Sequence, residues 1–182
     1  MTTVLFVCTG NLCRSPSAAQ LLAARLAEMG PPEVTVESAG TLGASVSVPA
    51  ELEEEGAAYG LDFSMHQSRR MDPELTGHAD LIIGMERSHV REIVLADPPS
   101  FARTFTLREL VRRGGLHGPR RRDQPLAGWL EQIGEGRRHV DLLGSSPLDD
   151  IPDPMGGTSR DYRAMLAELD TATRTIHLLI WP

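Results

Sequence analysis

The sequence predicts an α/β fold, a doubly wound four-stranded parallel sheet with helices on both faces. Residues 4–7 and 79–85 are nearly continuous apolar runs without polar alternation, which is typical of strands that are covered on both faces. Helical patterns alternate with the predicted strands, as they do around parallel sheets. Because 182 residues suit one domain with a sizeable core, we expect residues 1–182 to form a single domain.

Apolar spacing and helix breakers predict the individual elements. Strands are expected at residues 4–8, 34–38, 79–85 and 104–106. Helices are expected from residue 15, at 49–60, from 71, at 86–95, from 107, at 126–140 and at 160–179. The pattern weakens between residues 112 and 148, which we interpret as an extended segment of the domain. Within it, residues 112–115 and 118–123 are predicted to be loops, and the arginine cluster is predicted to be solvated.

Composition limits the classes of partner and compartment. The formal net charge of −7 argues against a general nucleic-acid binder, which is usually basic. The N-terminal residues lack a signal-peptide pattern, and no apolar stretch approaches the length needed to span a membrane. Both cysteines, Cys8 and Cys13, lie in one turn and cannot link distant parts of the chain, which fits a reducing compartment. We therefore expect a cytoplasmic protein that does not bind membranes or nucleic acid, and we favour a monomer over an oligomer.

A glycine-containing turn joins the first predicted strand to the first predicted helix. Backbone N–H groups that converge in such a turn, together with the helix dipole, favour an anion such as phosphate. Arg14 closes the turn with a planar fork of donors that can bind two oxygens of one oxyanion. The residues expected to bind phosphate are Thr9, Gly10, Asn11, Leu12, Cys13, Arg14 and Ser15.

Cys8 opens the same turn, where the N–H groups, the dipole and Arg14 favour a thiolate. A thiolate so placed is a nucleophile aimed at the phosphorus of a bound ester, and Ser15 could hydrogen-bond the sulfur. The alternative is that Cys8 is merely a small buried side chain. Cys13 either packs as an apolar side chain or forms a protective redox pair with Cys8. The two cysteines are too few for a metal site, and we expect no metal or other cofactor.

These residues resemble the signature of the low-molecular-weight protein-tyrosine phosphatases. The motifs that carry the resemblance are Val7-Cys8-Thr-Gly-Asn-Leu-Cys13-Arg14-Ser15-Pro16, Ser38-Ala39-Gly40-Thr41, His66 before Ser68-Arg69, and Asp153-Pro154. The resemblance covers nearly the whole chain. It implies a phosphomonoester hydrolase that acts on a phosphorylated protein or peptide through a cysteinyl-phosphate intermediate and releases inorganic phosphate.

The resemblance also implies roles for residues far from the turn. Asp153 would be the general acid that protonates the leaving oxygen and then the base that activates water. Ser38 and His66 would hydrogen-bond Asn11 and hold the phosphate loop open. The alternative for His66, from the residue pattern alone, is a solvated loop histidine.

Two further acids precede this aspartate in the chain. Asp149 and Asp150 are expected to be merely solvated.

Two residues bear on substrate choice. Many tyrosine-specific members of the family have an aromatic residue after Asp-Pro, whereas this chain has Met155, which packs more loosely on a ring. The late loop also resembles that of the bacterial branch that removes phosphate from arginine, but that branch has a threonine in the signature loop where this chain has Leu12. An apolar Leu12 favours phosphotyrosine over phosphoarginine.

Other functions remain open at this stage. Arsenate mimics phosphate in such a cup, so a thiol-dependent arsenate reductase on the same fold is one alternative. Such enzymes usually have Arg-Ser-Gln, and the thioredoxin-coupled ones need more cysteines than this chain has. A non-catalytic phosphoprotein-binding or redox-sensing module is another alternative, and intact Arg14 and Asp153 argue against it.

Overall fold

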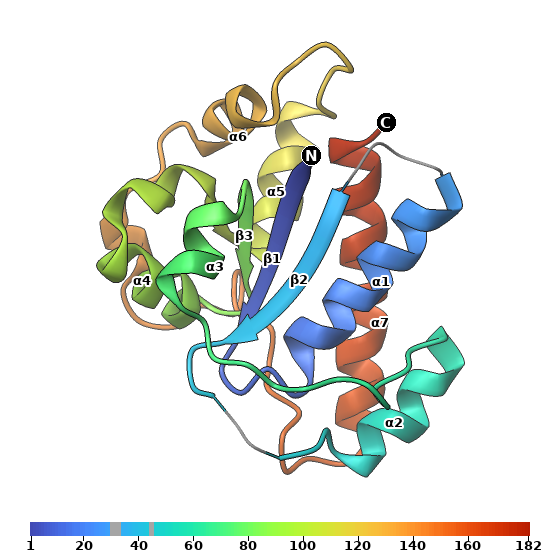
Figure 1. Ribbon diagram of the computed structural model, residues 1–182. Coiled ribbons are helices and arrows are strands. Elements are labelled where there is room, and N and C mark those ends of the chain that lie inside the picture. The colour runs from blue at the N-terminus through green and yellow to red at the C-terminus, as the bar shows by residue number, and fades with distance from the viewer. Residues whose placement is uncertain (30–33, 44–45) are drawn as a thin grey trace.

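The computed structural model describes residues 1–29, 34–43 and 46–182. Four parallel strands form one sheet in the order β2-β1-β3-β4 (Figure 1). Their bounds are β1 Thr2–Cys8, β2 Val34–Gly40, β3 Leu81–Gly84 and β4 Thr104–Thr106. The four strands that the sequence predicts are all present, and the predicted α/β class is confirmed.

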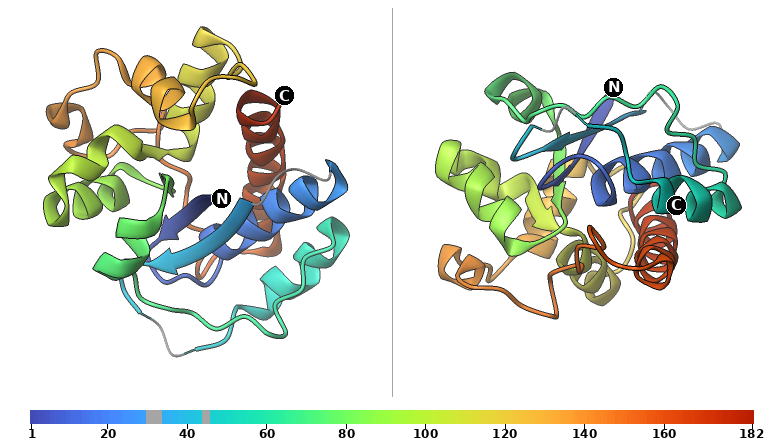
Figure 2. Two further views of the ribbon diagram at one scale, coloured as in Figure 1. Left: turned by 45° about the horizontal axis from the view of Figure 1, so that its top comes forward. Right: turned by 90° about the horizontal axis from the view of Figure 1, so that it is seen from below.

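Seven α-helices and three short 3-10 helices are described around the sheet. They are α1 Arg14–Met29, α2 Ala50–Gly56, η1 Ala57–Tyr59, α3 Pro73–His78, α4 Arg87–Ala96, η2 Pro98–Arg103, α5 Leu107–His117, α6 Leu126–Gly134, η3 His139–Leu142 and α7 Ser159–Ile180. Helices α1, α5 and α7 lie on one face of the sheet, and α3 and α4 lie on the other (Figures 1 and 2). In the described part of the chain, no helix is long and apolar enough to cross a bilayer.

Successive side chains of β1 point to opposite faces of the sheet, because side chains alternate along a strand. Val4 and Phe6 join the large core beneath α1, α5 and α7, and Leu5 and Val7 join a smaller core beneath α3 and α4. All four side chains are fully buried. A strand buried on both faces cannot alternate with polar residues, and this is why residues 4–7 are continuously apolar.

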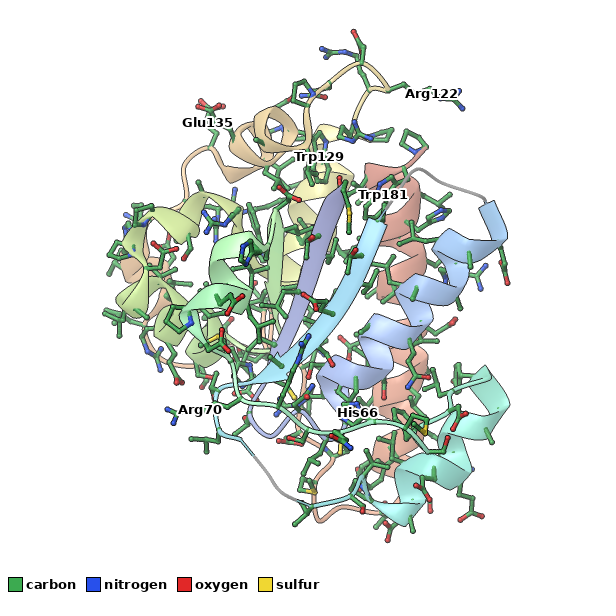
Figure 3. All side chains as sticks on the ribbon, in the orientation of Figure 1. His66, Arg70, Arg122, Trp129, Glu135 and Trp181 are labelled. Atoms are coloured by element: carbon green, nitrogen blue, oxygen red, sulfur yellow. The ribbon has the colours of Figure 1, made fainter. Side chains whose placement is uncertain are left out.

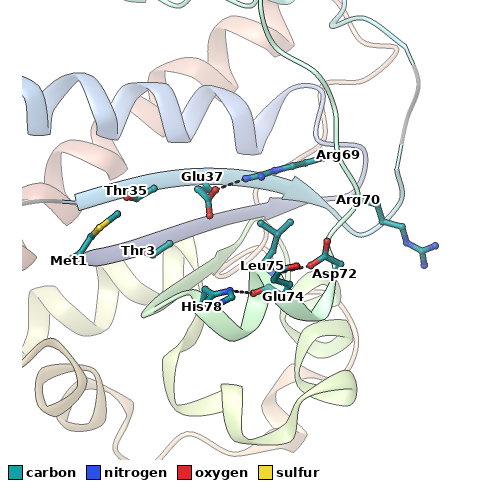
Figure 4. Close-up of a pocket in the computed structure, with 10 residues that line it drawn as sticks. All are labelled: Met1, Thr3, Thr35, Glu37, Arg69, Arg70, Asp72, Glu74, Leu75 and His78. Atoms are coloured by element: carbon teal, nitrogen blue, oxygen red, sulfur yellow. Dashed lines mark hydrogen bonds and ion pairs between the residues drawn. The ribbon is translucent and has the colours of Figure 1, made fainter.

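The α3 side of the sheet is less completely covered beside β2. There, Thr3, Thr35 and Glu37 line a polar hollow of about 410 Å³ that α3 and the chain before it border (Figure 4). Arg69 reaches over the edge of this hollow and pairs with Glu37 at 3.1 Å. This region is a polar face of the sheet, remote from the main core.

Two predictions of secondary structure in the segment of residues 112–148 are wrong. Residues 112–115, predicted to be a loop, belong to α5, because Gly114 lets that helix lie against the Trp129 ring and Leu179. The predicted helix at 126–140 ends at Gly134. Beyond it the buried Arg137 donates to the carbonyl oxygens of Phe101 and Thr104, at 2.8 and 2.6 Å, which draws the chain inward and ends the helix.

The arginine cluster divides into one bound and two exposed side chains. The N–H of Arg120 donates to the carbonyl of Leu179 at 2.7 Å, and its guanidinium donates to that of Ile180 at 2.8 Å. These bonds satisfy carbonyls at the end of α7, which would otherwise lack partners. Arg121 and Arg122 are exposed, and Arg122 projects away from the molecule (Figure 3). The prediction of a solvated cluster is therefore wrong for Arg120.

Candidate active site

The turn singled out in the sequence lies at the carboxyl end of β1, near the middle of the sheet. The chain passes from β1 to β2 on one side and later returns to β3 on the other, so the turn sits where the strand order reverses. Ligands of open α/β sheets bind at this switch point. Cys8 is the last residue of β1 and Arg14 the first residue of α1, so strand and helix fix both ends of the turn.

The Cys8 sulfur is buried and faces hydrogen-bonding groups. Its Sγ lies 3.0 Å from Ser15 Oγ, and the N–H of Asn11 points at it from 3.2 Å. Ser15 Oγ also donates to the carbonyl of Ala39 at 3.2 Å, which holds the hydroxyl in place. Ser15 therefore occupies the place beside the sulfur that the sequence predicts for it.

Asn11 holds the turn from within and adopts a left-handed backbone with φ of 54°. Its side-chain NH₂ donates to Ser15 Oγ at 3.0 Å and Ser38 Oγ at 2.9 Å. Its carbonyl oxygen lies 2.7 Å from His66 Nε2. Thus the structure brings Ser38 and His66 to Asn11, although His66 meets the main chain rather than the side chain. His66 lies on the segment that crosses the lower end of β2 (Figure 3).

Two neighbours of His66 also bind the turn. The main-chain N–H of Arg69 donates to Asn11 Oδ1 at 3.0 Å, and Ser68 Oγ donates to the carbonyl of Gly10 at 2.7 Å. In the sequence they appear only as part of a family motif. Their contacts depend on how the 63–71 segment crosses the turn, which no local pattern specifies.

Arg14 is the most deeply buried charge of the site, with its side chain only 1% exposed. One terminal nitrogen, NH1, pairs with Glu86 and donates to the carbonyl of Ile151 at 3.0 Å. The other, NH2, lies 2.5 Å from Asp153 Oδ2. A buried charge needs such partners to offset its loss of hydration. The pairing brings together Arg14 and Asp153, which are 139 residues apart.

Glu86 is a residue of the site that the sequence does not single out. Its own burial acts to raise the pKa of Glu86, but the hydrogen bond and charge of Arg14 prevail and hold that pKa below its usual range. Glu86 caps α4 and exchanges hydrogen bonds with His89 in a capping box. Its position directly after β3, at the same sheet edge as Cys8, is the one sequence signal that could have indicated it.

The loop that carries Asp153 is anchored on both sides. The N–H of Ile151 donates to the carbonyl of Met85 at 2.8 Å, and the Ile151 side chain is buried. Asp153 itself stays 42% exposed, so it faces both Arg14 and solvent.

The prediction that Asp149 and Asp150 are merely solvated is wrong. Asp149 is buried and pairs with Arg87 and Arg112, at 2.6 and 2.8 Å. Asp150 accepts from the main-chain N–H groups of Arg87 and Ser146, at 2.8 and 2.6 Å. Both acids fasten the late loop to α4 and α5.

The two predicted substrate-pocket residues differ in exposure. Met155 is 48% exposed beside Asp153, whereas Leu12 is 6% exposed and belongs to the large core. Cys13 is also buried in that core, and this burial, the neighbouring Asp153 and Cys8 raise the pKa of its thiol to about 12. Both cysteines are free thiols. Across residues 1–29, 34–43 and 46–182, no three His, Cys, Asp or Glu side chains are grouped to hold a metal ion.

Comparison with known proteins gives matches along this chain. Residues 3–127 match the family model of the low molecular weight phosphotyrosine protein phosphatases. The phosphatase Etp of Escherichia coli is 32% identical over 124 residues, covering 67% of this chain and 80% of Etp. The protein-arginine-phosphatase of Geobacillus stearothermophilus is 32% identical over 173 residues, covering 92% of this chain and 88% of that protein.

Solved structures agree with these matches. A YwlE mutant from Bacillus subtilis has a TM-score of 0.71 at 25% identity, covering 97% of this chain and 96% of its own. A low molecular weight protein tyrosine phosphatase from T. tengcongensis gives the same TM-score at 26% identity, covering 97% of both chains. The protein therefore belongs to the low-molecular-weight protein-tyrosine phosphatase family, whose members are phosphoric monoester hydrolases that work through a cysteine.

Proposed function

We propose that the protein hydrolyses phosphotyrosine in proteins or peptides, with Cys8 as nucleophile, Arg14 as anion clamp and Asp153 as general acid. The observation that carries the proposal is the convergence of Arg14 with Asp153, at 2.5 Å, on the turn that holds the Cys8 sulfur. The buried Arg14 guanidinium lies at the end of β1, beside the Cys8 sulfur, and is paired with carboxylates. Such a guanidinium is suited to bind an oxyanion.

The geometry supports a double displacement. A phosphoester dianion that binds the Arg14 fork takes the place of Asp153 on NH2. The released Asp153 carboxylate takes up a proton from solvent and donates it to the leaving oxygen. The Cys8 thiolate attacks phosphorus as the phosphorus–oxygen bond breaks, which leaves a cysteinyl phosphate. Asp153, now ionised, accepts a proton from water, the water oxygen bonds to phosphorus, and the thiolate and inorganic phosphate are released. Main-chain N–H groups of residues 9–15 bind the oxyanion.

The exposed Met155 favours an aryl ester, whereas the buried Leu12 offers a substrate little surface. Met155 lies beside the general acid, where a thioether can pack on an aromatic ring. A working thiolate needs a reducing compartment, so we place the activity in the cytoplasm. Protein-arginine phosphatase activity is a second candidate, because the relative named for that activity matches 92% of the chain, including the late loop that carries Asp153.

The test is hydrolysis of matched phosphotyrosine and phosphoarginine peptides, without metal and with added thiol. We expect phosphotyrosine turnover that disappears in Cys8→Ser and falls by about 10²- to 10⁴-fold in Asp153→Asn, the usual contribution of a general acid. Asp123→Asn, in an exposed loop, is the matched control and should behave as wild type. A phosphoarginine preference would replace the first candidate by the second. No turnover of either peptide would leave arsenate reduction or phosphoprotein binding.

A further inference from the structure

His89 is a buried histidine in the first turn of α4 that the proposed mechanism does not use. Its two ring nitrogens face different partners. Nδ1 lies 3.1 Å from the main-chain nitrogen of Glu86, and Nε2 lies 3.0 Å from Thr9 Oγ1. Because a main-chain N–H can only donate, Nδ1 must accept. The neutral ring therefore carries its hydrogen on Nε2 and donates it to Thr9.

This assignment determines what the Thr9 hydroxyl can do. One of its lone pairs accepts from His89, and the other faces Arg14 NH2 at 3.5 Å. With donors on both lone pairs, the hydroxyl hydrogen is left over for an acceptor. The same Arg14 nitrogen binds Asp153, so this hydrogen lies beside the group that would grip a phosphate oxygen.

We propose that His89 is a positioning residue of the oxyanion site, which fixes the Thr9 hydroxyl as a hydrogen-bond donor to the bound phosphate. The inference deepens the proposed function and rests on it, since it supposes that the turn binds phosphate. His89 also holds the Glu86 N–H, so the same ring aligns the start of α4, where Glu86 meets Arg14.

Burial keeps the His89 ring neutral. Its burial lowers the pKa of His89 to about 4, the positive Arg14 acts in the same sense, and the carboxylates of Glu86, Asp153 and Asp150 oppose this shift only in part. A second ring proton would set Nδ1–H against the Glu86 N–H and place a second cation beside Arg14. The hydrogen-bond arrangement at Thr9 is therefore that of the neutral ring.

The experiment combines variants at both ends of the His89–Thr9 hydrogen bond. His89→Leu removes the donor and the acceptor, Thr9→Val removes only the hydroxyl, and the double variant removes both ends. His89→Gln is the rescue variant, because a glutamine at this helix position can accept the Glu86 N–H with its oxygen and donate with its NH₂. His78→Gln, at an exposed position of α3, controls for the loss of any histidine.

Two quantities are measured for each folded variant, the dissociation constant of inorganic phosphate by calorimetry and kcat/KM for an aryl phosphate. We expect His89→Leu and Thr9→Val each to raise the dissociation constant of phosphate and to lower kcat/KM by about tenfold, the effect of one hydrogen bond to a charged ligand. The double variant should be no worse than His89→Leu alone. His89→Gln should stay within about twofold of wild type, as should His78→Gln.

Three results would overturn the inference. These are wild-type phosphate affinity in His89→Leu, losses that multiply to about a hundredfold in the double variant, or a His89→Gln variant as defective as His89→Leu. If His89→Leu does not fold, Thr9→Val and His89→Gln still decide the matter. Phosphate binding does not require turnover. An inactive wild type that binds phosphate would therefore refute the proposed function and still test His89.

Discussion

Adding one methyl group to α5 should have opposite effects at two adjacent glycines. A Cβ at Gly114 would lie 2.7 Å from Leu179 Cδ1 and 3.2 Å from two atoms of the Trp129 ring, whereas a Cβ at Gly115 would meet nothing within 4 Å. Alanine favours a helix over glycine by about 0.8–1.0 kcal/mol at either position. Crowding in a packed core costs about 1–3 kcal/mol, and this cost applies only at Gly114.

The surroundings of Gly114 decide the sign of its effect. Leu179 is flexible and can rotate away, but the Trp129 ring is fully buried and its Nε1 donates to the carbonyl of Gly118 at 3.1 Å, so it cannot move freely. We therefore expect Gly114→Ala to lose up to about 2 kcal/mol of unfolding free energy and Gly115→Ala to gain up to about 1 kcal/mol.

Thermal unfolding of the two variants beside wild type measures this contrast. Gly114→Ala should lower Tm by up to about 8 °C, and Gly115→Ala should raise it by up to about 4 °C. Urea unfolding gives the free energies directly, provided that the slope with denaturant stays unchanged. Equal stabilisation by both substitutions would show that α5 and α6 are not packed through Gly114, and the reasoning would fail.

Two further predictions concern acid pH and the late loop. Below about pH 6.5 the unfolded chain protonates His89, whereas the folded protein does so only near pH 4. Unfolding therefore becomes more favourable as pH falls through this window, by at most about 3 kcal/mol, and the non-titrating His89→Gln variant should lack this part of the slope in urea titrations between pH 7 and 4. Asp149→Asn leaves Arg87 and Arg112 without their carboxylate, so we expect a loss of about 1–3 kcal/mol and a lower kcat as Asp153 loses its fixed position. An unchanged kcat in a measurably destabilised Asp149→Asn variant would show that Asp149 stabilises the fold but does not position Asp153.

The sequence predicted the sheet and the turn because short-range rules determine both. A continuously apolar run such as residues 4–7 forms a strand that is covered on both faces of the sheet. Pro16 favours the first turn of a helix, so a helix is expected directly after the glycine-containing turn. The contacts of Asp149 and Asp150 follow a different rule. A carboxylate in a loop is solvated unless a distant cation approaches it, and Arg87 and Arg112 come from α4 and α5.

The error at residues 112–115 has a similar cause. Two glycines in succession weaken a helix when only local propensity acts. Here Gly114 is the residue that permits close packing of Trp129 and Leu179, and the burial of that ring offsets the weak propensity. Tertiary packing thus prevails over local preference. This packing could not be predicted without knowing that α6 and α7 both contact α5 at Gly114.

The charges of the turn also bear on the proposed role of Asp153 as the acid. Arg14 faces two carboxylates, and Glu86 is held in its ionised form by hydrogen bonds from Arg14 and Ser88. A bound phosphate dianion and the Cys8 thiolate would add three negative charges beside one buried cation. Of the two carboxyl groups, Asp153 is the more exposed, at 42%, and it contacts Arg14 NH2, the nitrogen that a phosphate oxygen would take over. In the proposed mechanism, Glu86 therefore holds the arginine, whereas Asp153 takes up and transfers the proton.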